Sequence, residues 1–312
     1  MNRLSPFHIL ILKGLPNVGT ATIIKIISSE TIPGDLALYS DVIDTVKRVA
    51  PKTGENLTEN IVTKSIIEAS EIIASCELLN IEIIGYCDDR YPLNYKAIGN
   101  SAPVIIYCKG DSSLLNSPKM VAVIGSREVS EQGIKAGRYV TQKLVHNGFI
   151  VVSGLALGCD TVGHEECLNS GGKTIAILAH GLDIISPKEN IDLSERILES
   201  GCLVSEYPPY TIFNPNYFVA RDRLQSGLSN GIVVIETNVK GGTIHTVNFA
   251  LKQDRAVACI DYNDSLVLPT NAGNRMLIEN EKAFALSSRN IIEYIDLMVE
   301  RGGSYEQGEF QF

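Results

Sequence analysis

The first part of the chain carries apolar residues at the spacing of buried helix faces. These residues recur in the segments 9–12, 23–27 and 66–69, which indicates helices that each bury one side. Proline and glycine at 51–54 mark a turn between two of them. The pattern predicts a small all-helical domain over residues 1–80.

From about residue 119 the pattern changes to short β-branched runs that alternate with helical stretches. The predicted strands are Met120–Gly125, Phe149–Ser153, Thr174–Leu178, Cys202–Ser205, Gly231–Ile235 and Ala256–Ile260. The predicted helices are Glu131–His146, Asp160–Asn169, Leu193–Glu199 and Thr243–Gln253. Near-continuous apolar strands with intervening helices indicate a parallel sheet that is covered on both faces.

These elements predict an α/β fold with a doubly wound, mostly parallel sheet over residues 81–300. Residues 81–118 lead into it as a connector with short strands, one of them at 104–107. The polar segment 301–312 is expected to be a flexible tail. A doubly wound sheet binds its ligands at the carboxyl ends of the strands, so functional residues are expected at that edge.

Composition narrows the class of protein without naming a ligand. The 312 residues are 45% hydrophobic, and no apolar run approaches the roughly 20 residues that span a bilayer. No cleavage site follows an apolar N-terminal stretch, so a cytoplasmic protein without membrane contact is expected. The net charge of −9 argues against a general nucleic-acid coat. A local basic pocket stays open, because phosphate binding depends on the field at the site.

The seven cysteines indicate buried free thiols rather than a metal site. No two of them form a C-x-x-C pair, and most lie in apolar runs, which is typical of a reducing compartment. Cys159, His164 and Cys167 come close together in sequence, but their spacing matches no common zinc pattern. No metal is therefore expected.

Two strand ends carry residues suited to phosphate. Gly125, Ser126 and Arg127 follow the first strand, and a helix begins shortly afterwards with Ser130 as its N-cap. Glycine lets a ligand approach the backbone, and a helix N-terminus offers free N–H groups. The second strand ends in Ser153 and Gly154. The alternative in each case is a structural turn, with Arg127 as a surface residue.

Asp160 and His164 lie four residues apart on the helix after the second strand, and so share one face. They could form an acid–base pair, but such a pair more often supports the start of a helix. We therefore favour a structural role for both.

Two later segments add cations and a further glycine turn. Arg221 and Arg223 are two residues apart on a predicted helix, so one can face a ligand while the other holds an internal carboxylate such as Glu206 or Glu236. The alternative is a pair of solvated surface arginines.

Lys240, Gly241, Gly242 and Thr243 follow the next strand, as in loops that cradle phosphate. The alternative is a tight turn without a ligand. All four loops lie at carboxyl ends of parallel strands and should converge. No nucleophile and base accompany them, so neither catalysis nor a cofactor is expected.

Together these motifs resemble the DNA-processing protein A (DprA, also called Smf) family. The resemblance rests on 124–127, 153–160, 205–208, 221–229 and 241–243, in this order along residues 81–295. It implies an extended Rossmann-like fold preceded by a SAM-like or helix-hairpin-helix-like domain. By motif position, the expected DNA- or phosphate-binding residues are Gly125, Ser126, Arg127, Ser153, Gly154, Arg221, Arg223, Lys240, Gly241, Gly242 and Thr243.

The resemblance also implies a ligand and partners. It predicts binding of single-stranded DNA, dimerisation through the Rossmann-like domain, and work with RecA in natural transformation. Asp222 stands where the family has asparagine, which fits a specialised copy that acts with a toxin as an antitoxin or in phage defence.

Two other readings stay open. A nucleotide sensor or phosphoribohydrolase of the related LOG-like superfamily would use a similar glycine turn, but Thr246 stands where the catalytic glutamate is expected. A protein-interaction antitoxin with a vestigial pocket is the third reading.

Overall fold

The computed structural model describes residues 4–29 and 38–303, in which the predicted sheet is present. Within these residues the strands form one nine-stranded sheet in the order β1-β2-β6-β5-β4-β3-β7-β8-β9. Neighbours from β6 to β9 pair in parallel, whereas β1–β2 and β2–β6 are antiparallel. Of the predicted tail, 301–303 still belong to a helix and the rest lies outside the described residues.

The six strands predicted from residue 120 onward are all present, with ends that differ by at most one residue, whereas the strand expected at 104–107 ends three residues later. The strands are β1 Glu82–Gly85, β2 Ile105–Gly110, β3 Met120–Ile124, β4 Ile150–Ser153, β5 Thr174–Leu178, β6 Cys202–Ser205, β7 Gly231–Val234, β8 Ala256–Ile260 and β9 Phe284–Leu286. The sequence pattern did not predict β9, because three residues are too few to show a period.

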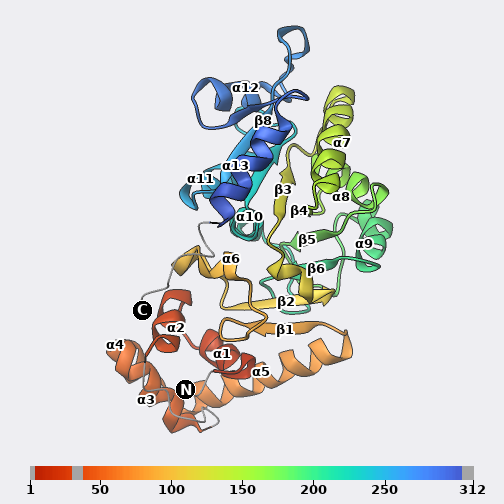
Figure 1. Ribbon diagram of the computed structural model, residues 1–312. Coiled ribbons are helices and arrows are strands. Elements are labelled where there is room, and N and C mark those ends of the chain that lie inside the picture. The colour runs from red at the N-terminus through yellow and green to blue at the C-terminus, as the bar shows by residue number, and fades with distance from the viewer. Residues whose placement is uncertain (1–3, 30–37, 304–312) are drawn as a thin grey trace.

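Helices cover both faces of the sheet (Figure 1). One face carries α7 Glu131–His146, α8 Cys159–Asn169, α9 Ile191–Leu198 and α13 Ile291–Gly303. The other carries α6 Leu93–Lys96, α10 Pro215–Leu228, α11 Thr243–Lys252 and α12 Ala272–Glu279. Short 3-10 turns lie at Gly99–Ser101, Ser112–Asn116, Lys188–Asn190 and Asp264–Leu266. None of the helices in the described ranges is long and apolar enough to cross a membrane.

Strand β3 shows how alternation divides the core between the two faces. Val121 and Val123 point into the cluster under α7, α8 and α13, whereas Ala122 and Ile124 point into the cluster under α10 and α11. Successive side chains of a strand face opposite ways, so a strand buried on both sides must be apolar throughout.

The N-terminal region is helical, as predicted, and packs at the β1–β2 end of the sheet (Figure 1). Its helices are α1 Pro6–Gly14, α2 Thr20–Ile27, α3 Tyr39–Val49, α4 Pro51–Glu55 and α5 Glu59–Leu78. Between α1 and α2, Asn17 takes the left-handed conformation with φ 61°, which asparagine tolerates better than most residues.

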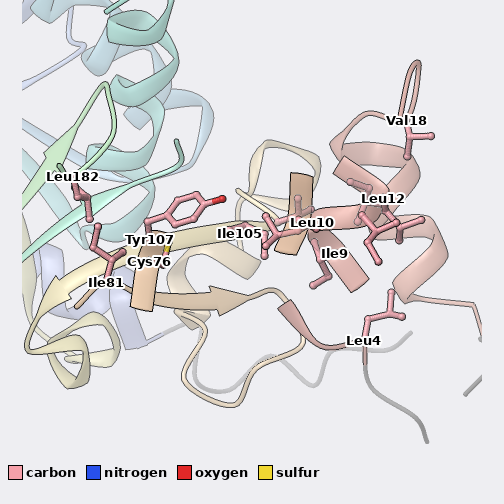
Figure 2. Packing of buried hydrophobic residues seen from close by; sticks show 14 of the residues in the cluster. Leu4, Ile9, Leu10, Leu12, Val18, Cys76, Ile81, Ile105, Tyr107 and Leu182 are labelled. Carbon is pink, nitrogen blue, oxygen red and sulfur yellow. The ribbon is translucent and has the colours of Figure 1, made fainter. Parts of the chain in front are cut away.

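The helical region and the sheet share one hydrophobic core. Figure 2 shows side chains of α1 and of the end of α5 beside Ile105 and Tyr107 of β2. The same cluster reaches Leu203 of β6 and Leu193 of α9. The boundary predicted at residue 80 is therefore crossed by continuous packing, and its standing as a domain boundary stays a prediction.

Two buried tyrosines, Tyr91 and Tyr107, differ in whether the side-chain hydroxyl has a hydrogen-bond partner. The hydroxyl of Tyr91 donates a hydrogen bond to the carbonyl of Pro103. The hydroxyl of Tyr107 is equally buried but has no hydrogen-bond partner within the described residues.

We predict opposite effects of removing the two hydroxyls. Tyr91→Phe should lower the free energy of unfolding by about 1–3 kcal/mol, because it leaves a buried carbonyl unpaired. Tyr107→Phe should leave that free energy unchanged or raise it by up to about 2 kcal/mol, because a buried polar group without a partner is unfavourable. Denaturant titrations of both variants measure this difference. Equal destabilisation by both would contradict the assignment of Tyr107.

Candidate functional site

A cavity of about 430 Å³ lies at the carboxyl ends of β3 and β7. These strands are neighbours in the sheet, yet β3 continues to β4 on one side and β7 to β8 on the other. Their loops therefore separate and leave a crevice, which is where doubly wound sheets bind ligands. Residues from the predicted β3, β7 and α10 segments meet in its wall.

The loop after β3 is held against the end of β7. A Cβ atom at Gly125 would overlap Cys159 and the carbonyl of Glu236, so only glycine fits there. The amide of Ser126 donates to that carbonyl at 2.7 Å. Arg127, the exposed end of this loop, places its guanidinium carbon 5.5 Å from the ring centre of Phe218.

The capping residue of α7 is held by Glu236. Ser130 caps the helix as predicted and accepts from the amide of Gly133 at 3.0 Å. Its own amide and hydroxyl donate to the two carboxylate oxygens of Glu236, at 2.8 and 2.6 Å. Glu236 thus fixes the capping residue, whereas the amides of Glu131 and Gln132 have no acceptor among the described residues. The expectation that this terminus offers N–H groups to a phosphate stays a prediction.

The loop after β4 forms the layer beneath the cavity. The hydroxyl of Ser153 is buried and donates to the carbonyl of Val123 at 2.6 Å. The amide of Gly154 donates to Asp160 at 3.1 Å. A Cβ atom at Gly154 would overlap the guanidinium of Arg221. Ser153 thus lies below the wall, and Gly154 makes room for the arginine.

Asp160 and His164 serve separate partners. Asp160 accepts from loop amides, and burial raises the pKa of its carboxyl while Arg221 opposes that rise. The ring of His164 shares a 2.7 Å hydrogen bond with Thr174. Burial, followed by the charge of Arg221, lowers the pKa of His164 to about 3. These bonds fit the structural role that we expected for both residues.

The two arginines of α10 divide as predicted. Arg221 lies in the cavity wall, donates to the carbonyl of Ile177 at 2.7 Å, and has its Nε 3.3 Å from Asp222. Arg223 turns away and binds both oxygens of Glu206, at 2.7 and 2.8 Å. Arg221 is therefore a mostly buried residue of the cavity wall, while Arg223 ties α10 to the loop after β6.

Asp222 places a second carboxylate in the wall beside Asp160. Burial raises the pKa of Asp222 to about 6, Asp160 adds to the rise, and Arg221 and His245 oppose it. The wall thus carries a group that changes charge close to neutral pH.

The loop after β7 supplies the open helix terminus of the site. Gly241, Gly242 and Thr243 line the cavity where α11 begins, and no side chain caps this helix. The amides of Gly242 and Thr243 have no acceptor within residues 4–29 and 38–303. Free amides at a helix N-terminus attract anions, which is the property expected of this glycine turn.

The structure brings most of the predicted site residues to one place. Those in the cavity wall are Gly125, Ser126, Arg127, Arg221, Gly241, Gly242 and Thr243. Ser153, Gly154 and Arg223 lie behind the wall, and Lys240 is exposed on the loop before α11.

The cysteines are free thiols, of which all but Cys87 are buried. No group of potential ligands in the described residues is arranged to hold a metal ion. Cys159 and Cys167 contact backbone carbonyls instead.

Comparison with known proteins identifies the family. The sequence profile described as DNA recombination-mediator protein A matches residues 82–296. The chain belongs to this family. DNA processing protein DprA of Bacillus subtilis (strain 168) is 30% identical over 258 residues, which are 83% of this chain and 85% of that protein. DprA of Streptococcus pneumoniae (strain ATCC BAA-255 / R6) is 37% identical over 205 residues, 66% of this chain and 71% of that protein.

Solved DprA structures share the fold. The X-ray structure of DprA from Streptococcus pneumoniae aligns with a TM-score of 0.77 at 28% identity and covers 93% of this chain and 98% of that one. DprA from Helicobacter pylori, a structure described for its single-stranded DNA binding mode, aligns with a TM-score of 0.62 at 26% identity. It covers 70% of this chain and 96% of that one. The predicted family and the Rossmann-like fold are confirmed.

Sequence reasoning missed several wall residues of this DprA-family chain. Phe218, Asn238 and His245 line the cavity, but none belongs to a glycine turn or to a cationic pair. Phe218 lies three residues before Arg221, one helical turn away, and this spacing was the only signal that could have found it.

We predict that Glu236→Gln destabilises the fold by roughly 1.5–3 kcal/mol, because it removes two charge-assisted hydrogen bonds and a negative charge at a helix N-terminus. Glu128→Gln is the matched control, since Glu128 is exposed on the loop before α7 and should change stability by less than about 0.5 kcal/mol. Thermal melts of both variants decide the matter. A Glu236→Gln protein as stable as the parent would show that the cap is dispensable.

Proposed function

We propose that this protein binds single-stranded DNA, without a chemical step, in the cavity between β3 and β7. The observation that carries the proposal is the meeting of Arg127, Arg221 and the uncapped N-terminus of α11 around one cavity. All three are donors to phosphate. The relative from Helicobacter pylori, described for its single-stranded DNA binding mode, supports the choice of ligand.

A single strand suits this site better than a duplex. The cavity has the volume of a small-molecule pocket, so it can hold about one nucleotide unit of a flexible strand. The bases of a duplex stay stacked inside the helix, whereas those of a single strand can turn outward onto protein side chains. Phe218 in the wall offers an aromatic surface for such a base.

We assign no catalytic residue. Asp160 and His164 are engaged by the loop amides and by Thr174, and Thr246 stands in the wall where a LOG-like enzyme would have its glutamate. The size of the cavity also favours a second candidate function, the sensing of a small nucleotide. Work with RecA or a toxin, and dimerisation, stay predictions from the family.

The first prediction concerns the two wall arginines. Arg127→Ala and Arg221→Ala should each weaken binding of a labelled oligothymidylate by about 10- to 150-fold, since each removes one charge-assisted contact of roughly 1.5–3 kcal/mol. The dependence of affinity on salt should also become flatter. Binding curves at two salt concentrations measure both effects.

The controls are Arg196→Ala and Lys52→Ala, which remove exposed cations of α9 and α4. Both should bind like the parent. Thermal melts are needed for Arg221→Ala, because this side chain also holds the carbonyl of Ile177. Parental affinity in both wall variants, with normal melts, would refute the cavity. Displacement of DNA by a mononucleotide at equal concentration would favour the sensor.

The second prediction concerns pH. A bound phosphate disfavours the charged form of Asp222, so binding should tighten as the pH falls through the pKa of about 6 of this carboxyl. Asp222→Asn should bind more tightly than the parent above about pH 7, where Asp222 is ionised, and should lose most of this pH dependence. Affinity measured from about pH 7.5 to 5.5 tests it. An unchanged profile in Asp222→Asn would contradict the role of Asp222.

A further inference from the structure

Beside the cavity, the carboxyl edge of the sheet exposes a row of apolar side chains. We call it the shelf and define it as Leu157, Ile184, Tyr210, Ile212 and Phe213. Tyr210, Ile212 and Phe213 are 62%, 78% and 44% exposed. Burying side chains of this size would stabilise the fold by about 1.5–3 kcal/mol each, so their exposure has no explanation in folding.

The loop that carries the shelf is fixed rather than loose. The rings of Tyr207 and Tyr217 stack at 4.1 Å and close its two ends. The amide of Tyr210 donates to Asp183 at 2.7 Å, and the carbonyl of Thr211 accepts from the amide of Gly181 at 3.2 Å. These contacts fix the backbone of the loop from which the exposed side chains project.

Two further observations show how firmly the shelf is set. Tyr210 has φ 66°, a left-handed conformation that costs free energy for a residue other than glycine and gathers at functional sites. The ring of Phe213 packs edge-on against His180, with centres 4.7 Å apart. Tyr210 is therefore exposed to solvent despite an unfavourable backbone conformation, and Phe213 is held against the ring of His180.

The shelf continues the cavity along the sheet. Ala156, Phe218 and Val219 line the cavity. Leu157 of the shelf follows Ala156 directly, and Phe213 of the shelf lies five residues before Phe218. His180 lies just beyond β5, two strands from β3, which is about 10 Å at roughly 4.8 Å per strand. About three stacked nucleotides at roughly 3.4 Å each would cover this distance.

The segment that carries Tyr210, Ile212 and Phe213 of the shelf contains no carboxylate that would repel an anionic DNA strand. Residues 207–220 contain no charged side chain. Asp183 is engaged by the amide of Tyr210, and Glu206 by the guanidinium of Arg223. The segment that carries most of the shelf is thus uncharged and aromatic, and the one carboxylate hydrogen-bonded to it, that of Asp183, is turned towards the Tyr210 amide.

From this continuity we propose that the shelf is a stacking platform for the bases of a single DNA strand whose phosphate lies in the cavity. The inference rests on the proposed function. Base stacking on aromatic rings tolerates any sequence, because every base has a flat face. Binding should therefore become stronger with strand length but stay indifferent to base identity.

The chain contains no tryptophan, so Tyr210→Trp introduces a single fluorescent reporter into the shelf. An oligothymidylate of about eight residues should quench this emission, and a thymidine dinucleotide, which fills only the cavity, should not. Tyr39→Trp, a partly exposed site on α3, is the matched control and should not respond. Unchanged Tyr210→Trp emission at saturating octamer overturns the shelf.

A second pair of variants tests the energetics. Tyr210→Ala should weaken binding of the octamer about 5- to 150-fold and leave the dinucleotide unaffected, whereas Tyr210→Phe should keep parental affinity for both. Equal losses for octamer and dinucleotide in Tyr210→Ala would contradict stacking outside the cavity. The two proposals fail separately: Arg127→Ala and Arg221→Ala report the cavity, and the tryptophan emission reports the shelf.

Discussion

The carboxylate of Glu236 is the constraint on which the site depends. It lies at the end of β7, fully buried, and accepts hydrogen bonds from the amide and hydroxyl of Ser130 on the loop after β3. Its backbone carbonyl receives the amide of Ser126. This residue therefore joins the two loops that diverge at the crevice and fixes the capping residue of α7. The uncapped N-terminus of α11 lies in the wall of the same crevice, where free amides attract anions.

The second constraint is electrostatic. A chain of net charge −9 can attract phosphate only through local fields, and here the field comes from Arg127, Arg221 and the amides of α11. The same wall contains Asp160 and Asp222. Burial keeps the pKa of Asp222 near 6, so the balance between attraction and repulsion shifts close to neutral pH. In the proposed binding mode, affinity is thus a small difference between attraction and repulsion by the charges of the wall.

Much of the fold followed from the sequence, because buried parallel strands are apolar along their whole length and the turns after them carry glycine. The division of work between Arg221 and Arg223 was also predictable, since two residues on a helix point in different directions. The bond between Ser130 and Glu236 was not, because the two residues are 106 positions apart. Nor was the contact between Gly154 and Arg221, which exists only after α10 crosses β4 and β5. Pairings made by the tertiary fold leave no local pattern.

The shared core between the N-terminal helices and β2 bears on how such chains can change over evolution. The side chains of α1 and α5 meet Ile105, Tyr107 and Leu203 directly, so substitutions on either side alter the fit of the other. A chimaera joined near residue 80, with helices from one relative and a sheet from another, would bring together surfaces that were never selected as a pair. The two parts should therefore be inherited and exchanged as one unit, although the sequence pattern predicts two domains.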